Sequence, residues 1–368
     1  MTQLPDIAQA TLTFTQSLPW LFPDLKLTED DRFLITLNSV FSNRIMFPDG
    51  FANHPRYYKF NQRLPFEHIP EHDLSISKDI DTVVEHRAKE LLNKNQPIKV
   101  FWSGGIDSTL ATAALLSHAK HKDQISVYHT CESIRENPHF YDFILSHGVD
   151  TVMWSDSWST PFNSNDLLVT GTSSDEITGS LDKSFYEKNH NQLSGNWRDY
   201  FKQNGFPHLI ERCEELFSKS HSPIETLFDT RWWFYFYIRH TYFARRDWDL
   251  NLENNFASNV AQFFNCKEFD AWSVHNKHSI IGSKYSDYKM PFKQATNRYW
   301  QNNDYLVNKE KVNSYLTTMW MSKKVSAFSQ HYLFIYKNAD GDYVKFSPPQ
   351  SPFVSKKQVL EALHVHGY

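Results

Sequence analysis

Cysteine is scarce in this chain. Only three cysteines occur among 368 residues, Cys131, Cys213 and Cys266, and no two of them form a C-x-x-C pair. Cysteines this widely separated exclude a zinc ribbon and a disulfide framework. They are typical of a protein from a reducing compartment, and we expect a cytoplasmic location.

The chain also lacks an excess of positive charge and a long apolar run. Its formal net charge is -4 and its pI is about 6.5, so no overall basic field attracts nucleic acid, although a local basic groove stays open. The N-terminus lacks the basic and apolar regions of a secretory signal. The most apolar segment, residues 231–248, is too short and too charged to span a bilayer, so we expect no membrane partner. We predict instead a buried helix with arginines at its edges.

Apolar periodicity predicts alternating helices and strands in the middle of the chain. The expected elements are a helix over 77–95, a strand over 98–102, a helix over 109–120, a strand over 125–130 and two further strands over 151–154 and 167–170. A strand, turn, helix and strand in this order predict a βαβ unit. The sequence therefore predicts an α/β fold, in which helices flank a parallel sheet.

Composition divides the chain into three parts. Residues 1–75 mix short apolar runs with Pro, Asn and His, which predicts short strands and loops. The α/β pattern occupies residues 76–325. Residues 326–368 contain the run YLFIYKNADGDYVKF, in which Asp340 and Gly341 separate two apolar stretches. We predict a C-terminal β-hairpin appendage there.

The stretch VFWSGGIDSTLATAALL places two glycines where the first strand is expected to become a helix. Gly104 and Gly105 let the backbone turn tightly and bring amide groups against a ligand. Amides at a helix N-terminus favour an anion, and phosphate is a natural one. Ser103 and Ser108 can add hydroxyl donors, and Asp107 is a candidate Mg²⁺ ligand. The alternative is a plain turn with serine and aspartate as helix caps.

The full S-G-G-x-D-S string, following a strand, resembles the pyrophosphate loop of the N-type ATP pyrophosphatase superfamily. It is not a Walker A motif, because no G-K-[ST] follows. The resemblance implies the adenine nucleotide α-hydrolase-like fold, also called HUP. It also implies that ATP is cleaved between its α and β phosphates, with an adenylated intermediate and release of pyrophosphate.

A second string, LLVTGTSSDEITGS at residues 167–180, resembles the motif of the asparagine synthetase and β-lactam synthetase branch. The resemblance implies that Asp175 binds Mg²⁺ together with Asp107, that Gly171 belongs to the nucleotide site and that Glu176 is a catalytic candidate. Two acids about 68 positions apart cooperate only if adjacent parallel strands bring both loops to one carboxyl edge. In the alternative, Asp175 and Glu176 only cap a helix.

The match to this branch is incomplete. Thr172 stands where the branch has a glutamate proposed as a base, and Thr178, Gly179 and Ser180 replace its Gly-Gly end. These departures leave the acceptor half-reaction open. Glutamine-dependent members begin with a nucleophilic cysteine, whereas residue 2 here is threonine, so we expect no glutaminase domain. Nitrogen would come from free ammonia, an amine substrate or a separate amidotransferase partner.

Downstream lysines are candidates for stabilising charge on pyrophosphate. The resemblance, which extends over residues 77–325, favours Lys289 and Lys324 as catalytic residues, with solvated surface lysines as the alternative. The same two stretches contain Lys284, Lys293, Arg298 and Lys323. Glu132 and Glu136, after the second strand, would either contact substrate or cap a helix.

Together these features predict an enzyme that uses ATP and Mg²⁺ to adenylate a carboxylate or an equivalent oxygen, which a nitrogen nucleophile then attacks to form an amide. Its partners would be a small carboxylate and an amine or ammonia. Two alternatives stay open. One is a nucleobase-modifying enzyme that acts on tRNA or DNA, which the acidic balance does not favour. The other is a nucleotide-binding module without turnover, which Thr172 keeps open.

Overall fold

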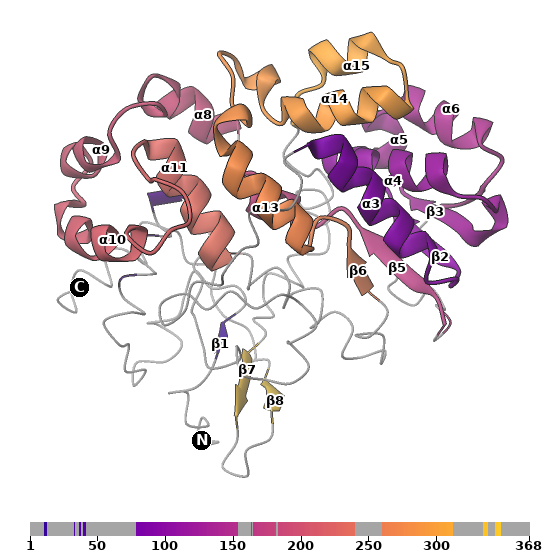
Figure 1. The fold of residues 1–368 in the computed structure, drawn as a ribbon, viewed down its shortest axis with the longest axis horizontal. Helices are drawn as coiled ribbons and strands as arrows, with labels where there is room; N and C mark the ends of the chain where they lie inside the picture. The colour runs from indigo at the N-terminus through magenta and orange to yellow at the C-terminus, as the bar shows by residue number, and fades with distance from the viewer. Residues whose placement is uncertain are drawn as a thin grey trace.

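The computed structural model describes residues 11–12, 33, 37, 40–41, 79–153, 163, 165–181, 183–239, 260–311, 334–337 and 343–346 (Figure 1). The strands are β1 (Thr11–Leu12), β2 (Ile98–Phe101), β3 (Ile125–His129), β4 (Asp150–Met153), β5 (Leu167–Thr170), β6 (Val260–Gln262), β7 (Phe334–Lys337) and β8 (Tyr343–Phe346). The first helices are α3 (Ile80–Leu92), α4 (Ile106–His118), α5 (Cys131–Glu136), α6 (Pro138–Ser146) and α7 (Ser174–Ile177). They are followed by α8 (Lys183–Asn189), α9 (Trp197–Gln203), α10 (Ile210–Phe217), α11 (Leu227–Trp233), α13 (Lys267–Asn276), α14 (Met290–Tyr299) and α15 (Asn303–Asn308).

Five strands form a parallel sheet in the order β4-β3-β2-β5-β6. The central strand β2 pairs in parallel with β3 on one side, Ile98 opposite Ile125, and with β5 on the other, Ile98 opposite Leu167. The predicted fold class, a parallel sheet flanked by helices, is therefore confirmed. The predicted strands and the helix on each side of β2 also agree with the structure to within a few residues.

The core forms because the central strands and α4 bury most of their apolar side chains. Ile98, Val100, Val127 and Val169 are fully buried, and α4 is buried along most of its length. Helices α3 and α14 pack against α4. Asp79 caps the N-terminus of α3, because its carboxylate accepts a hydrogen bond from the Thr82 amide at 3.1 Å. This packing fixes α4, and with it the glycine turn that precedes it.

Helices α8 to α11 gather at one side of the molecule, away from the sheet (Figure 1). Helix α11 continues into a π-helical segment, Phe234–Arg239, and buries Trp232 and Trp233. The prediction of a buried helix is confirmed over residues 231–238, whereas residues 240–248 lie outside the described residues. The prediction that arginines lie at its edges is wrong for Arg231. That side chain is fully buried, and its guanidinium group donates hydrogen bonds to the carbonyls of Gly179, Ser180 and Phe41.

A second, small sheet has the order β1-β7-β8, and both of its pairings are antiparallel. Strands β7 and β8 form the predicted C-terminal hairpin, although Asp340 and Gly341 lie outside the described residues. Strand β1 pairs with β7, Thr11 opposite Ile335, so residues from both ends of the chain meet in this sheet. The boundaries at residues 75 and 325 stay predictions.

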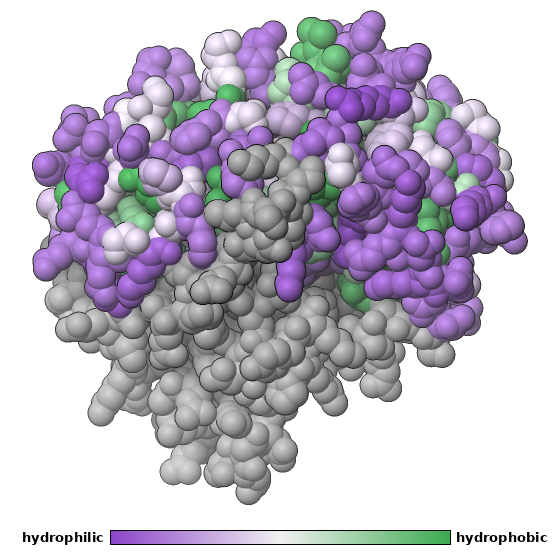
Figure 2. Space-filling model, in the orientation of Figure 1, coloured by the Kyte–Doolittle hydropathy of each residue, from purple (hydrophilic) through white to green (hydrophobic). Residues whose placement is uncertain are grey.

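The described surface carries few exposed large apolar side chains. These are Leu145, Met153 and Val307. On the face drawn in Figure 2, apolar residues form small patches separated by hydrophilic ones. Within the described part of the chain, every helix is too short or too polar to cross a bilayer.

Candidate functional site

The chain changes direction across the sheet between β2 and β5. From β2 it continues outward to β3 and β4, then returns to the other side of β2 to form β5 and β6. In open α/β sheets, ligands bind outside the carboxyl ends of the strands where the strand order reverses in this way. The two loops singled out in the sequence follow β2 and β5, so both lie at this point.

The glycine turn joins β2 to α4. Gly104 has a φ of +82°, and a Cβ atom there would lie 2.6 Å from the Ser133 carbonyl oxygen. Ser103 and Ser108 close the turn through hydroxyl oxygens 2.9 Å apart. Gly105 is the N-cap of α4 and supplies no side-chain acceptor to the first amides of that helix. The first amides of α4 therefore lack a side-chain cap, as an anion site requires, whereas the amides of Ser103 and Gly105 donate to serine hydroxyls at 3.0 and 3.4 Å.

Gly171 lets the second loop approach the first. A Cβ atom at this position would lie 2.8 Å from the Ser108 amide nitrogen and 2.9 Å from its Cα atom. Real Cβ atoms do not approach backbone this closely, so any larger residue would push β5 and the start of α4 apart. The two predicted nucleotide loops are thus in backbone contact.

Substitution of Gly104 gives a direct test of this turn. We expect Gly104→Ala to reduce the free energy of unfolding by about 2–4 kcal/mol, because it adds a clash with Ser133 to the cost of a positive φ. Gly148 is the matched control, since its φ is +65° but no atom lies within 4 Å of its added Cβ. Gly148→Ala should cost only about 1–2 kcal/mol. Equal losses in urea unfolding would contradict the close contact at Gly104.

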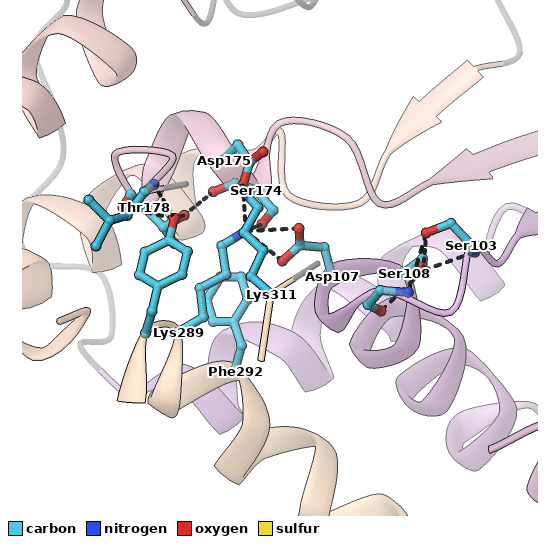
Figure 3. Close-up of polar contacts among 12 residues, drawn as sticks. Ser103, Asp107, Ser108, Ser174, Asp175, Thr178, Lys289, Phe292 and Lys311 are labelled. Atoms are coloured by element: carbon cyan, nitrogen blue, oxygen red, sulfur yellow. Dashed lines mark hydrogen bonds and ion pairs between the residues drawn. The ribbon is translucent and has the colours of Figure 1, made fainter. Parts of the chain in front are cut away.

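One ammonium group joins both loops (Figure 3). Lys289 Nζ lies 2.8 Å from both carboxylate oxygens of Asp107, 2.7 Å from Asp175 Oδ1 and 2.7 Å from Ser174 Oγ. The Lys289 side chain is fully buried, whereas those of Asp107 and Asp175 are 23% and 35% exposed. The acids from the two loops thus face each other across a single buried cation, and their outer sides stay open to solvent.

The backbone at Lys289 is unusual. Its φ is +58°, a left-handed conformation that costs a non-glycine residue about 1–2 kcal/mol. The Lys289 amide donates to the Ile280 carbonyl at 2.9 Å, and the residue forms the N-cap of α14, with Pro291 in the first turn. Strain of this kind is typical of functional positions. It aims the side chain back at the two loops.

Opposite charges in this cluster hold Asp175 and Lys289 ionised. Partial burial opposes ionisation of Asp175, but the ammonium groups of Lys289 and Lys311 outweigh it and lower the pKa of Asp175. Burial would likewise lower the pKa of Lys289, but Asp107 and Asp175 outweigh it and raise that pKa. Lys289 therefore stays protonated at neutral pH. It suits charge neutralisation and not imine formation, which needs a neutral amine.

Sequence reasoning missed three residues of the cluster. Ser174 and Lys311 both contribute directly, and Lys311 Nζ lies 2.5 Å from Asp175 Oδ1. Lys309, two residues earlier, pairs with Glu136 at 2.7 Å beside the glycine turn. The K-x-K spacing of the two lysines was a usable signal, because residues two apart on an extended segment point to the same side.

The other candidates differ in their burial and in their partners. Glu176 is buried in α7, at 1% exposure. Thr172, at the position of the missing glutamate, has its hydroxyl oxygen 2.5 Å from that of Thr170. Lys284 is exposed, whereas Lys293 is buried and donates to backbone carbonyls. Arg298 pairs with Asp81. Lys323 and Lys324 lie outside the described residues.

The donor set fits Mg²⁺ bound together with phosphate, and not a cage of protein ligands alone. Among the described residues, no group of three or more His, Cys, Asp or Glu side chains could hold a metal. Asp107 and Asp175, however, offer carboxylate oxygens that contact one nitrogen atom. Mg²⁺ is commonly held by one or two carboxylates plus substrate phosphates, and these two acids suit that arrangement.

No protein-family model matches the chain, and no curated protein is significantly similar to it. Its class is therefore defined by its own geometry. The protein is an α/β domain whose parallel sheet, with two loops meeting at the reversal of strand order, is compatible with a nucleotide-binding fold.

Proposed function

We propose that this protein is an ATP-dependent ligase that adenylates a carboxylate and passes it to a nitrogen nucleophile. One observation carries the proposal: Asp107 and Asp175, from loops after adjacent parallel strands, both contact the Lys289 ammonium. Two acids and a lysine beside an open glycine turn match the charges needed to hold a triphosphate and its metal ion.

Each group then has a role. The turn at Gly104 and Gly105 binds phosphate oxygens through backbone amides. Asp107 and Asp175 hold Mg²⁺, which supplies charge neutralisation for the phosphates. Lys289 and Lys311 stabilise the negative charge that develops on pyrophosphate as it leaves. In balanced form, a carboxylate oxygen attacks the α-phosphorus and pyrophosphate leaves. The nitrogen nucleophile then attacks the acyl carbon, losing a proton as AMP leaves and the amide forms.

The first half-reaction can be tested without knowing the amine. The protein is incubated with ATP, Mg²⁺, labelled pyrophosphate and a panel of small carboxylic acids, and label entering ATP is measured. We expect exchange of label that depends on one class of acid, with AMP and pyrophosphate as the net products once ammonia or an amine is added. Asp175→Asn should abolish the exchange, because it removes one metal ligand.

The outcomes separate the alternatives. Release of ADP and orthophosphate would reject cleavage between the α and β phosphates. ATP binding without exchange for any acid, with Asp175→Asn changing only the affinity, would identify a nucleotide-binding module without turnover. Exchange that depends on tRNA or DNA and not on a small acid would identify the nucleobase-modifying alternative.

A further inference from the structure

A carboxylate lies against the turn that favours an anion. Glu136 is the last residue of α5, and its side chain is 18% exposed. Its Cβ atom lies 2.9 Å from the position that a Cβ would take on Gly104. Its Oε1 atom lies 3.9 Å from the corresponding position on Gly105. A negative charge here opposes a bound phosphate, so its presence needs an explanation.

The partner of Glu136 is Lys309, whose side chain is mostly covered. Lys309 Nζ donates to Glu136 Oε1 at 2.7 Å, and the Lys309 side chain is only 10% exposed. Its backbone is held on both sides, because the Lys309 carbonyl accepts from Lys293 Nζ at 3.2 Å and its amide donates to the Tyr305 carbonyl at 3.1 Å. The ammonium group is thus kept within reach of the glycine turn.

Residues 309–311 project their side chains alternately. Glu310 faces the exposed Lys183, whereas Lys309 and Lys311 face the two loops. Lys309 lies beside the turn after β2, and Lys311 contacts Asp175 after β5. One short segment therefore places an ammonium group at each loop, and each ammonium is paired with a protein carboxylate.

We propose that Lys309 is a binding residue for the β and γ phosphates and that Glu136 is an internal stand-in for them. The inference rests on the proposed function, since it requires phosphate at the glycine turn. Without nucleotide, the Glu136 carboxylate holds the Lys309 ammonium in place. When a phosphate chain binds, its oxygens replace Glu136 as the partner of Lys309, because they carry more charge and accept several hydrogen bonds.

The exchange of partners sets the affinity of the site. Glu136 competes with phosphate, so it weakens the binding of ATP and speeds the release of pyrophosphate. Lys309 has the opposite effect. Neither residue affects a ligand that lacks the β and γ phosphates. If the ion pair between α5 and the segment after α15 were purely structural, its loss would instead change the affinity for every ligand equally.

Calorimetric titration of the full chain with ATP, inorganic pyrophosphate and AMP, each with Mg²⁺, distinguishes these roles. We expect Glu136→Gln to lower the dissociation constants of ATP and pyrophosphate about fivefold and to leave that of AMP unchanged. The reason is that it removes a charge repulsion that changes a dissociation constant by about tenfold at most. Lys309→Met should weaken ATP and pyrophosphate about tenfold. Glu132→Gln is the matched control, because that carboxylate lies on the same helix but faces Cys131.

Glu136→Gln keeps the shape of the side chain, so it carries the test even if Lys309→Met does not fold. If the unsubstituted chain binds ATP and pyrophosphate and Glu136→Gln binds them equally well or more weakly, the inference is overturned. The proposed function is not affected by that result. If the unsubstituted chain binds neither ATP nor pyrophosphate, the proposed function fails, and the inference fails with it.

Discussion

Lys289→Met is expected to lower the rate of pyrophosphate formation by at least about 10²-fold, the usual loss when one preorganised charge-stabilising donor is removed. The Lys289 ammonium contacts both loop acids and Ser174, and its side chain is fully buried. Its removal takes away the cation shared by Asp107 and Asp175, and only Asp175 keeps a lysine partner, Lys311. The repulsion between the two acids should separate the loops that bind the phosphates.

Stability should fall much less than activity in this variant. Asp107 and Asp175 keep 23% and 35% of their side-chain surface exposed, so water can hydrate both charges once the ammonium is gone. We expect a loss of about 1–3 kcal/mol in urea unfolding. Lys183→Met is the matched control, since it removes a half-exposed lysine whose partner is Glu310 and should change neither quantity. A Lys289→Met protein that retains full exchange activity would show that the bridge is only structural.

The sheet and the glycine turn were predictable because their signals are local. The apolar runs at 98–102 and 125–130, separated by a helix-forming stretch, predict two parallel strands and a crossover without any long-range information. The same pattern predicts that β2 and β3 are neighbours, but it does not predict the rest of the strand order. The choice of β5 as the second neighbour of β2 depends on contacts that no local pattern contains. Once that pairing exists, the meeting of Asp107 and Asp175 follows.

The residues that the sequence did not reveal are those placed by long-range contacts. The charge of Arg231 favours a position at the edge of its helix. Backbone carbonyls from three other residues instead accept hydrogen bonds from its guanidinium group, so the side chain is buried. Lys311 was missed because the K-x-K spacing places Lys309 and Lys311 on one side of their segment but does not indicate that this segment, after α15, returns to the sheet edge. Lys289 was a candidate only through a weak resemblance. Its importance depends on a left-handed backbone conformation that its lysine side chain does not favour.

A second buried ion pair, far along the chain from the glycine turn, tests the helical part of the fold. Lys277 Nζ lies 3.0 Å from Asp229 Oδ1, and their side chains are 0% and 1% exposed. Asp229 also accepts hydrogen bonds from the amides of Glu225 and Thr226, which caps helix α11. Burial lowers the pKa of Lys277, although Asp229 opposes this shift. The Lys277 ammonium also donates to the Pro223 carbonyl, so a counter-charge and a carbonyl together compensate for the buried cation.

Lys277→Met should reduce the free energy of unfolding by about 3–5 kcal/mol, because it leaves the Asp229 carboxylate buried without a counter-charge. Lys277→Met combined with Asp229→Asn should recover most of this loss, since both charges disappear and the asparagine oxygen still accepts from the Thr226 amide. Urea unfolding measures each variant and the coupling between them. Lys219→Met, which removes the half-exposed partner of Glu215 at 3.7 Å, is the control and should cost less than about 0.5 kcal/mol. If the double variant lost as much free energy of unfolding as the two single variants added together, the two side chains would not form a pair. The packing of α11 against the segment after α13 would then have to be revised.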